Sequence, residues 1–193
     1  MPQLKQNDNK RYSYADYLAW NDDSRWELIE GQAVCMSPAP GRHHQRISKL
    51  LGRQIDLYLS DKSCEMYYAP FDVRFLETKD DVADDSIDTV VQPDIVVVCD
   101  PEKLDDRGCK GAPDLIIEIL SPATARMDMT VKFELYQHFG VKEYWIVHPQ
   151  DQTVLAFKLL ESGLYGVPDR YCAEDTIRVP LLGELNVDLT RVF

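Results

Sequence analysis

Two short apolar segments leave this chain few ways to fold: residues 94–99 (DIVVVC) and residues 114–120 (DLIIEIL). Each is a nearly continuous run of aliphatic residues, which is the pattern of a strand covered on both faces. Such strands lie in the centre of a sheet that has other layers on both sides. The sequence therefore predicts an α/β (or α+β) fold with a mixed central sheet flanked by helices.

Two further segments predict the flanking helices. Residues 43–60 form the clearest amphipathic pattern, and residues 125–139 form a second one that ends before Gly140, a residue suited to a helix C-terminus. On the first of these helices the apolar positions share one face at roughly 100° per residue. They are Ile47, Leu50, Leu51, Ile55 and Tyr58.

The other segments complete an α-β-β-β-α-β core with additions at both ends. Residues 25–36 predict an N-terminal hairpin that turns at Glu30-Gly31, and residues 66–76 and 143–148 predict further strands. Residues 153–160 and 170–179 predict a strand-rich C-terminal tail. No long polar linker interrupts residues 25–193, so we expect one domain over residues 1–193, with residues 1–11 flexible.

The charge of the chain excludes a protein coated with basic residues for nucleic-acid binding, because the 193 residues carry a net charge of −12. The acidity is concentrated, however. Residues 77–106 contain 11 acidic residues against two lysines, a net charge of −9. The remainder is close to neutral, so the total charge is a weak argument against a polyanionic partner.

The sequence also indicates a compartment. No apolar run approaches the ~18 residues of a membrane span, and the N-terminus has no apolar segment typical of a signal peptide. We therefore expect no membrane association and a cytoplasmic protein. Five cysteines occur without a C-x-x-C pair, which predicts reduced and mostly packed thiols. They are Cys35, Cys64, Cys99, Cys109 and Cys172.

Two carboxylates stand in the apolar segments, where a core would ordinarily exclude them. Asp94 follows Pro93 and opens the first segment, and Glu118 lies between isoleucines in the second. A buried carboxylate must be paired, protonated or bound to a metal. If the two strands are neighbours, Asp94 and Glu118 converge as oxygen ligands of the kind that Mg²⁺ or Mn²⁺ prefers.

A lysine could complete this pair. The position two residues after Glu118, on the same side of its strand, is Leu120. The next lysine along the chain is Lys132, on the second predicted helix, with Tyr136 one turn later. His44 begins the first helix on the side that leans toward the sheet.

Four stretches of the chain resemble one known family. They are Q-P-D-I-V-V-V, G-A-P-D-L-I-I-E-I-L-S-P-A-T, K-F-E-L-Y and G-V-K-E-Y-W-I-V. From about Trp26 to Pro149 the chain is similar to the Uma-two family of bacterial proteins, within the restriction-endonuclease-like superfamily that has the PD-(D/E)xK signature. The resemblance implies the same α-β-β-β-α-β core.

The resemblance also implies a Mg²⁺-dependent endonuclease acting on DNA, with Mn²⁺ as a substitute ion. Pro93-Asp94 matches the PD half of the signature, and Glu118 matches its second acidic residue. Leu120 departs from the lysine position, which Lys132 would replace. Asp94 and Glu118 would hold the metal, with the Ile119 carbonyl as a further ligand, and Lys132 would stabilise developing charge. His44 would act as a general acid or base, or support a ligand.

Each of these residues also has a purely structural interpretation. Asp94 and Glu118 can each belong to a structural ion pair with a basic group, or form hydrogen bonds at the strand ends. Lys132 can be a solvated helix lysine, and His44 can be a core or helix-capping residue. The basic stripe of Arg42, Arg46, Lys49 and Arg53 can contact phosphates or simply face solvent.

Two alternatives to a DNA endonuclease stay open at this point. Leu120 and the net charge of −12 favour an inactive nuclease fold that serves as a binding or assembly module. Hydrolysis of another phosphoester, such as a nucleotide, is a further alternative. We also expect a homodimer, because cleavage of two strands needs two sites.

Overall fold

The computed structural model describes residues 10–21, 24–77 and 83–193, and it confirms the predicted α+β class. A mixed six-stranded sheet forms the centre, in the order β12-β11-β10-β9-β6-β3. Strands β9 and β10 are parallel, and the other neighbours are antiparallel. Its strands are β3 (Glu65–Tyr68), β6 (Ile95–Val98), β9 (Leu115–Ile119), β10 (Glu143–His148), β11 (Thr153–Lys158) and β12 (Asp169–Cys172).

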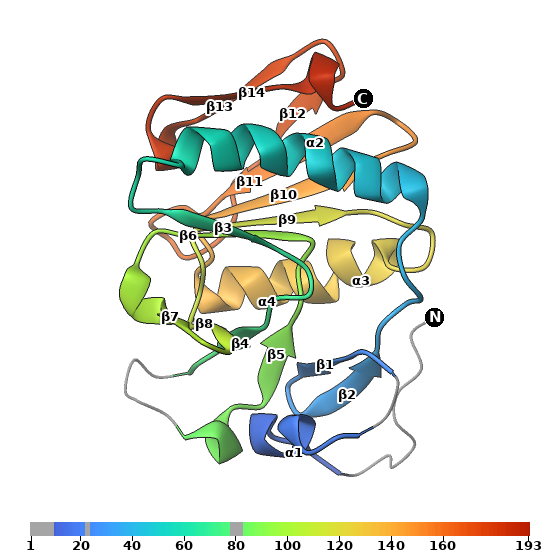
Figure 1. Ribbon diagram of the computed structural model, residues 1–193, viewed down its shortest axis with the longest axis vertical. Coiled ribbons are helices and arrows are strands. Elements are labelled where there is room, and N and C mark those ends of the chain that lie inside the picture. The colour runs from blue at the N-terminus through green and yellow to red at the C-terminus, as the bar shows by residue number, and fades with distance from the viewer. Residues whose placement is uncertain (1–9, 22–23, 78–82) are drawn as a thin grey trace.

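Helices cover both faces of this sheet (Figure 1). Helix α2 (Arg42–Leu59) lies on one face, and α3 (Ala125–Met129) and α4 (Val131–Phe139) lie on the other. The chain therefore contains the expected core in the order α2, β3, β6, β9, α4 and β10. A hairpin of β13 (Thr176–Val179) and β14 (Leu185–Asp188) packs beyond α2, near the C-terminus.

A second six-stranded sheet, which the sequence analysis did not predict as a unit, lies on the far side of α4 (Figure 1). The predicted hairpin supplies its edge, and helix α1 (Tyr14–Leu18) lies against it. Its strands are β1 (Trp26–Ile29), β2 (Gln32–Cys35), β4 (Val73–Phe75), β5 (Thr89–Val91), β7 (Leu104–Asp105) and β8 (Gly108–Lys110). Short 3-10 helices complete the described part: η1 (Asp84–Ser86), η2 (Pro101–Lys103), η3 (Pro180–Leu182) and η4 (Leu189–Arg191).

The alternation of side chains along β9 divides the core into two layers. Leu115, Ile117 and Ile119 pack with α2 and the β13–β14 hairpin. Ile116 packs on the opposite face, with α4 and the second sheet. Glu118 shares that second face, because side chains two apart on a strand point the same way. The fold therefore directs the Glu118 carboxylate toward α4.

Three predicted elements are divided in the structure. The strand expected at 66–76 is β3 and β4, which join different sheets, because Pro70 has no N–H to continue a ladder. The helix expected at 125–139 breaks at Thr130, whose hydroxyl donates to the Arg126 carbonyl (2.6 Å). The strand expected at 170–179 is β12 and β13, again in different sheets. Residues 1–11 were expected to be flexible, and residues 1–9 of this segment lie outside the described residues.

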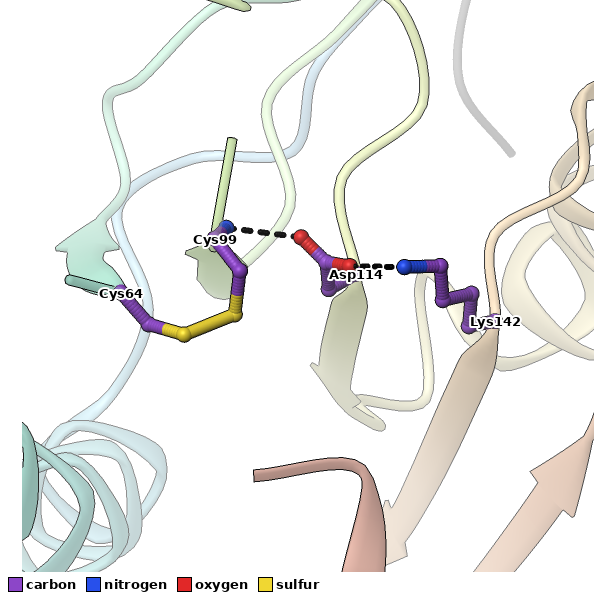
Figure 2. Close-up of a disulfide and its surroundings, with 4 residues drawn as sticks. All are labelled: Cys64, Cys99, Asp114 and Lys142. Carbon is purple, nitrogen blue, oxygen red and sulfur yellow. Dashed lines mark hydrogen bonds and ion pairs between the residues drawn. A yellow bond between two sulfur atoms is a disulfide. The ribbon is translucent and has the colours of Figure 1, made fainter. Parts of the chain in front are cut away.

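The prediction of five reduced thiols is wrong for two of them, because Cys64 and Cys99 form a disulfide (Figure 2). The cause is the register of β3 and β6, which places Glu65 opposite Val98. The next pair outward is therefore Cys64 and Cys99. The backbone N–H of Cys99 also donates to Asp114 (2.7 Å), and Asp114 accepts from Lys142 (2.6 Å).

We predict that reducing this disulfide lowers the stability of the protein. It closes a loop with a sequence separation of 35. Cross-linking such a loop restricts the unfolded chain and contributes about 3 to 4 kcal/mol. Dithiothreitol or the Cys64→Ala variant should therefore lower the midpoint of thermal unfolding by about 10 °C. Cys172→Ala, which removes an exposed free thiol, is the control. An unchanged midpoint after complete reduction would contradict the prediction.

Candidate active site

Asp94 and Glu118 meet at one end of the β6–β9 pair. Strands β6 and β9 are antiparallel with Ile95 opposite Ile117, so the residue before β6 lies beside Glu118. The backbone N–H of Asp94 donates to Glu118 Oε2 (3.3 Å). In return, the backbone N–H of Ile119 donates to Asp94 Oδ2 (2.8 Å). Each carboxylate is therefore held by the backbone of the other strand.

Glu118 is buried and receives two side-chain donors from α4. Lys132 Nζ and the Tyr136 hydroxyl each bind Glu118 Oε1, at 2.9 Å and 2.8 Å. Residues 132 and 136 are one helical turn apart, which places both on the helix face that packs against β9. The lysine and tyrosine singled out in the sequence therefore reach the same carboxylate oxygen.

Two more carboxylates, which the sequence analysis did not identify, surround Lys132. Glu27 on β1 accepts from Lys132 Nζ (2.9 Å) and from the backbone N–H of Gln92 (2.9 Å). Asp128 on α3 lies 3.9 Å from the same nitrogen. The side chains of these acids, of Glu118 and of Lys132 are all between 4% and 6% exposed. One buried ammonium is thus enclosed by three buried carboxylates.

Burial and charge oppose each other in this cluster. Burial raises the pKa of Glu118 and of Asp128, and the positive charge of Lys132 only partly offsets that effect. Burial alone would lower the pKa of Lys132, but the three carboxylates raise it well above its usual value. Burial and the charge of Glu118 also raise the pKa of Tyr136, which stays a neutral hydrogen-bond donor. Lys132 is therefore charged at neutral pH.

His44, in the first turn of α2, binds Asp94, the other candidate metal ligand. Its Nε2 lies 3.1 Å from Asp94 Oδ2. Burial lowers the pKa of this imidazole, but the hydrogen bond to Asp94 and the charge of Asp94 outweigh burial and raise it. The pair links α2 to the start of β6.

These residues line a cleft of about 840 Å³. Glu27, His44, Asp94, Glu118 and Lys132 all contribute to its wall. The wall also includes Arg25, Met36, Gly41, Gln45, Lys49, Tyr68, Pro70, Gln92, Ser121 and Asp128. The cleft is large enough for a nucleotide-sized ligand.

The oxygen donors in this cleft suit a hard divalent cation in chemical type. Asp94 and Glu118 offer carboxylate oxygens, which Mg²⁺ prefers to nitrogen or sulfur. Within the described residues, no three His, Cys, Asp or Glu side chains form a ready-made metal site. Mg²⁺ commonly binds through one or two carboxylates and takes its other oxygens from water and substrate phosphates. The pair therefore fits such an ion.

The structure brings all four predicted catalytic residues to one cleft, but it divides the predicted basic stripe. Of that stripe only Lys49 lines the cleft, and Arg46 donates to the carbonyl of Val192 (3.0 Å).

The two acids that the sequence analysis missed had recognisable patterns. Glu27, like Glu118, is an acid inside a short apolar strand. Asp128 stands four residues before Lys132, which is one helical turn.

Comparisons with known proteins identify the family of this chain. Residues 14–190 match the sequence model of the Uma2 family, described as "Putative restriction endonuclease". The uncharacterized protein slr1290 of Synechocystis sp. is 28% identical over 182 residues, which cover 90% of this chain and 87% of that protein.

A solved structure shows the same fold. It is the crystal structure of a "putative nuclease belonging to DUF820" from Anabaena variabilis, with a TM-score of 0.72 and 19% identity. The match covers 94% of this chain and 97% of that chain. No described helix is both long and apolar enough to cross a membrane. Because the family model matches most of its length, this chain belongs to the Uma2 family, and its fold is that of the Anabaena variabilis protein.

Proposed function

We propose that this protein is a metal-dependent endonuclease that hydrolyses phosphodiester bonds in DNA. The observation that carries the proposal is the meeting of Asp94 and Glu118 in the cleft, with Lys132 bound to Glu118 (2.9 Å). Two carboxylates and a lysine are the residue types that hold a divalent cation and stabilise charge on a phosphate. The family description and the nuclease fold support the same reaction class.

Asp94 and Glu118 would hold Mg²⁺, or Mn²⁺ as a substitute. When bound, the ion supplies Lewis-acid polarisation of the phosphate and makes water a stronger acid. Lys132 has three N–H donors, and Glu118 and Glu27 accept two of them. Its third donor and its fixed charge stabilise negative charge that develops on the phosphodiester.

His44 would orient Asp94 and move a proton. Its Nε2 binds Asp94 Oδ2 (3.1 Å), and its pKa is raised above the usual value. A charged imidazole in the cleft can give a proton to the departing alcohol oxygen. The four residues thus cover ion binding, charge stabilisation and proton transfer.

The rim of the cleft offers groups for the phosphate backbone. The start of α2 contributes its N-cap residue Gly41 and, in the first turn, Gln45, and Gly41 has no side chain that could cap the helix. The N–H groups of such a turn and the helix dipole favour an anion. Arg25 and Lys49 are exposed cations on the same cleft. A DNA strand would lie beside these two cations, despite the net charge of −12.

One observation favours the alternative of an inactive nuclease fold that acts as a binding module. Both oxygens of Glu118 already accept hydrogen bonds, from Asp94, Lys132 and Tyr136. Calorimetric titration with Mn²⁺ separates the two functions, because an inactive module of this kind binds no ion at the site.

We further propose that the endonuclease acts as a homodimer, which light scattering at micromolar concentration tests.

We predict that isosteric removal of either metal-ligand charge abolishes cleavage. Asp94→Asn and Glu118→Gln keep the side-chain volume but lose the negative charge that holds the ion. Nicking of supercoiled plasmid DNA with Mg²⁺ should fall by about 100-fold or more in each variant. Chelation by EDTA should have the same effect on the wild type.

The matched control for these variants is Asp56→Asn, an exposed acid on α2 outside the cleft. It should cleave at the wild-type rate. Nicking that persists in both Asp94→Asn and Glu118→Gln would refute the site, and failure of the wild type to nick DNA with Mg²⁺ or Mn²⁺ would refute the reaction.

We also predict that Lys132→Met destabilises the protein, and more so as the pH rises. The variant leaves three buried carboxylates without their cation, at a cost on the order of 3–5 kcal/mol. Without Lys132 the folded-state pKa values of Glu118 and Asp128 lie further above the unfolded values. The folded state then binds protons that the unfolded state has released, so the free energy of unfolding falls with rising pH.

The midpoint of thermal unfolding measures this effect. For Lys132→Met it should drop between pH 5 and pH 8 by several degrees more than for the wild type. Lys62→Met, at an exposed lysine beside Tyr58, is the control and should follow the wild type. A variant whose stability is constant or rises over this range would show that Lys132 does not neutralise the cluster.

A further inference from the structure

A second, smaller cavity of about 280 Å³ adjoins the candidate active site. It lies at helix α1 and the start of β1, where the sequence W-x5-W places Trp20 and Trp26. Two residues, Arg25 and Gln92, line both this cavity and the large cleft. Its described lining consists of Tyr17, Leu18, Trp20, Ser24, Arg25, Trp26 and Gln92.

Aromatic rings form most of the apolar wall. The Trp20 and Trp26 rings lie 5.8 Å apart at 70°, and the Tyr17 and Trp20 rings lie 5.6 Å apart at 60°. All three side chains are partly buried, and they pack against the buried Tyr14 and Leu28. The rings are thus held by the core while part of their surface faces the cavity. Aromatic faces in such a cavity suit a planar ring ligand, which gains stacking contacts.

The polar side of the cavity is equally well held. Gln92 Nε2 donates to the Tyr17 hydroxyl (3.1 Å) and to Asp72 Oδ1 (2.8 Å). These bonds orient the amide so that Gln92 Oε1 faces Arg25, and it accepts from Arg25 Nε (3.2 Å) and Nη2 (2.6 Å). The exposed guanidinium is therefore fixed at the boundary of the two cavities, with further N–H donors left for a phosphate.

The cavity with its aromatic residues and the larger cleft share Arg25 and Gln92, so the arginine stands where the two meet. In a nucleic-acid strand each base is joined through its sugar to a phosphate on either side. We propose that the cavity takes one unpaired nucleobase, that Arg25 binds the adjoining phosphate, and that the next phosphodiester enters the cleft. The inference rests on the proposed nuclease function and extends it, because a base that enters this cavity must be single-stranded or flipped out of a duplex.

Tryptophan fluorescence tests this directly. The chain has three tryptophans, and Trp145 is fully buried, so a cavity ligand changes the emission of Trp20 and Trp26. The probes are a single-stranded oligodeoxyadenylate of about eight nucleotides and an abasic chain of equal length, both in EDTA so that no cleavage occurs. The base-bearing strand should quench the emission, and the abasic chain should not quench it and should bind about tenfold more weakly.

Variants separate stacking from folding. Trp20→Leu keeps an apolar side chain but removes the aromatic face, so the dissociation constant of a labelled oligodeoxyadenylate should rise about tenfold by anisotropy. Arg25→Gln should weaken the oligonucleotide and the abasic chain alike. Leu164→Ala, at a residue 56% exposed outside both cavities, should bind as the wild type does. Circular dichroism establishes that each variant is folded, and Trp26→Leu replaces Trp20→Leu if the latter is not.

Three results would overturn the proposal: equal binding of the base-bearing and abasic chains, unchanged affinity in a folded Trp20→Leu variant, or quenching by a mononucleotide but not by the oligonucleotide. The last result would assign the cavity to a free nucleotide. The outcome is independent of the proposed reaction. Base binding in EDTA together with no nicking of plasmid DNA in Mg²⁺ would refute the nuclease function alone. Nicking in Mg²⁺ together with no quenching in EDTA would refute the cavity proposal alone.

Discussion

The contact between Lys132 and its carboxylates joins three parts of the fold: helix α4, the central sheet and the second sheet. Lys132 comes from α4, Glu118 from the central sheet and Glu27 from the second sheet, and one nitrogen lies 2.9 Å from an oxygen of each acid. A buried charge of this kind is tolerated only when it is fully paired, because removing one partner leaves the others desolvated. The cluster therefore fixes the distance between the two sheets at the point where the cleft opens.

The β6–β9 pair is held at both ends by carboxylates that bind backbone N–H groups. At the cleft end Asp94 and Glu118 each bind the other's strand. At the opposite end Asp114 binds the N–H of Cys99, next to the disulfide to Cys64 (Figure 2). The two ends differ in chemistry. At the cleft end the two acids also bind Lys132 and His44, and at the far end lie the disulfide and the ion pair of Asp114 with Lys142.

Much of the candidate site could be predicted from the sequence, and the failures have a common cause. Glu118 and Asp94 were recognisable because a carboxylate inside an apolar strand is costly and demands an explanation. Glu27 shows the same pattern, but β1 is short and its neighbours are set by pairing with β5, far along the chain. The disulfide was missed for the same reason, because Cys64 and Cys99 meet only through the register of β3 and β6.

The amino-acid sequence by itself determined the order of the core elements, the helical face of Ile47, Leu51 and Ile55, and the buried character of β6 and β9. These features depend on the spacing of apolar residues within one segment, which local geometry makes readable. Only the tertiary structure decided that residues 66–76 form two strands in different sheets. It also decided that Glu27 binds Lys132 and that a second cavity adjoins the cleft. Those arrangements depend on contacts between distant segments, and their free energy is a property of the assembled layers rather than of any one stretch of chain.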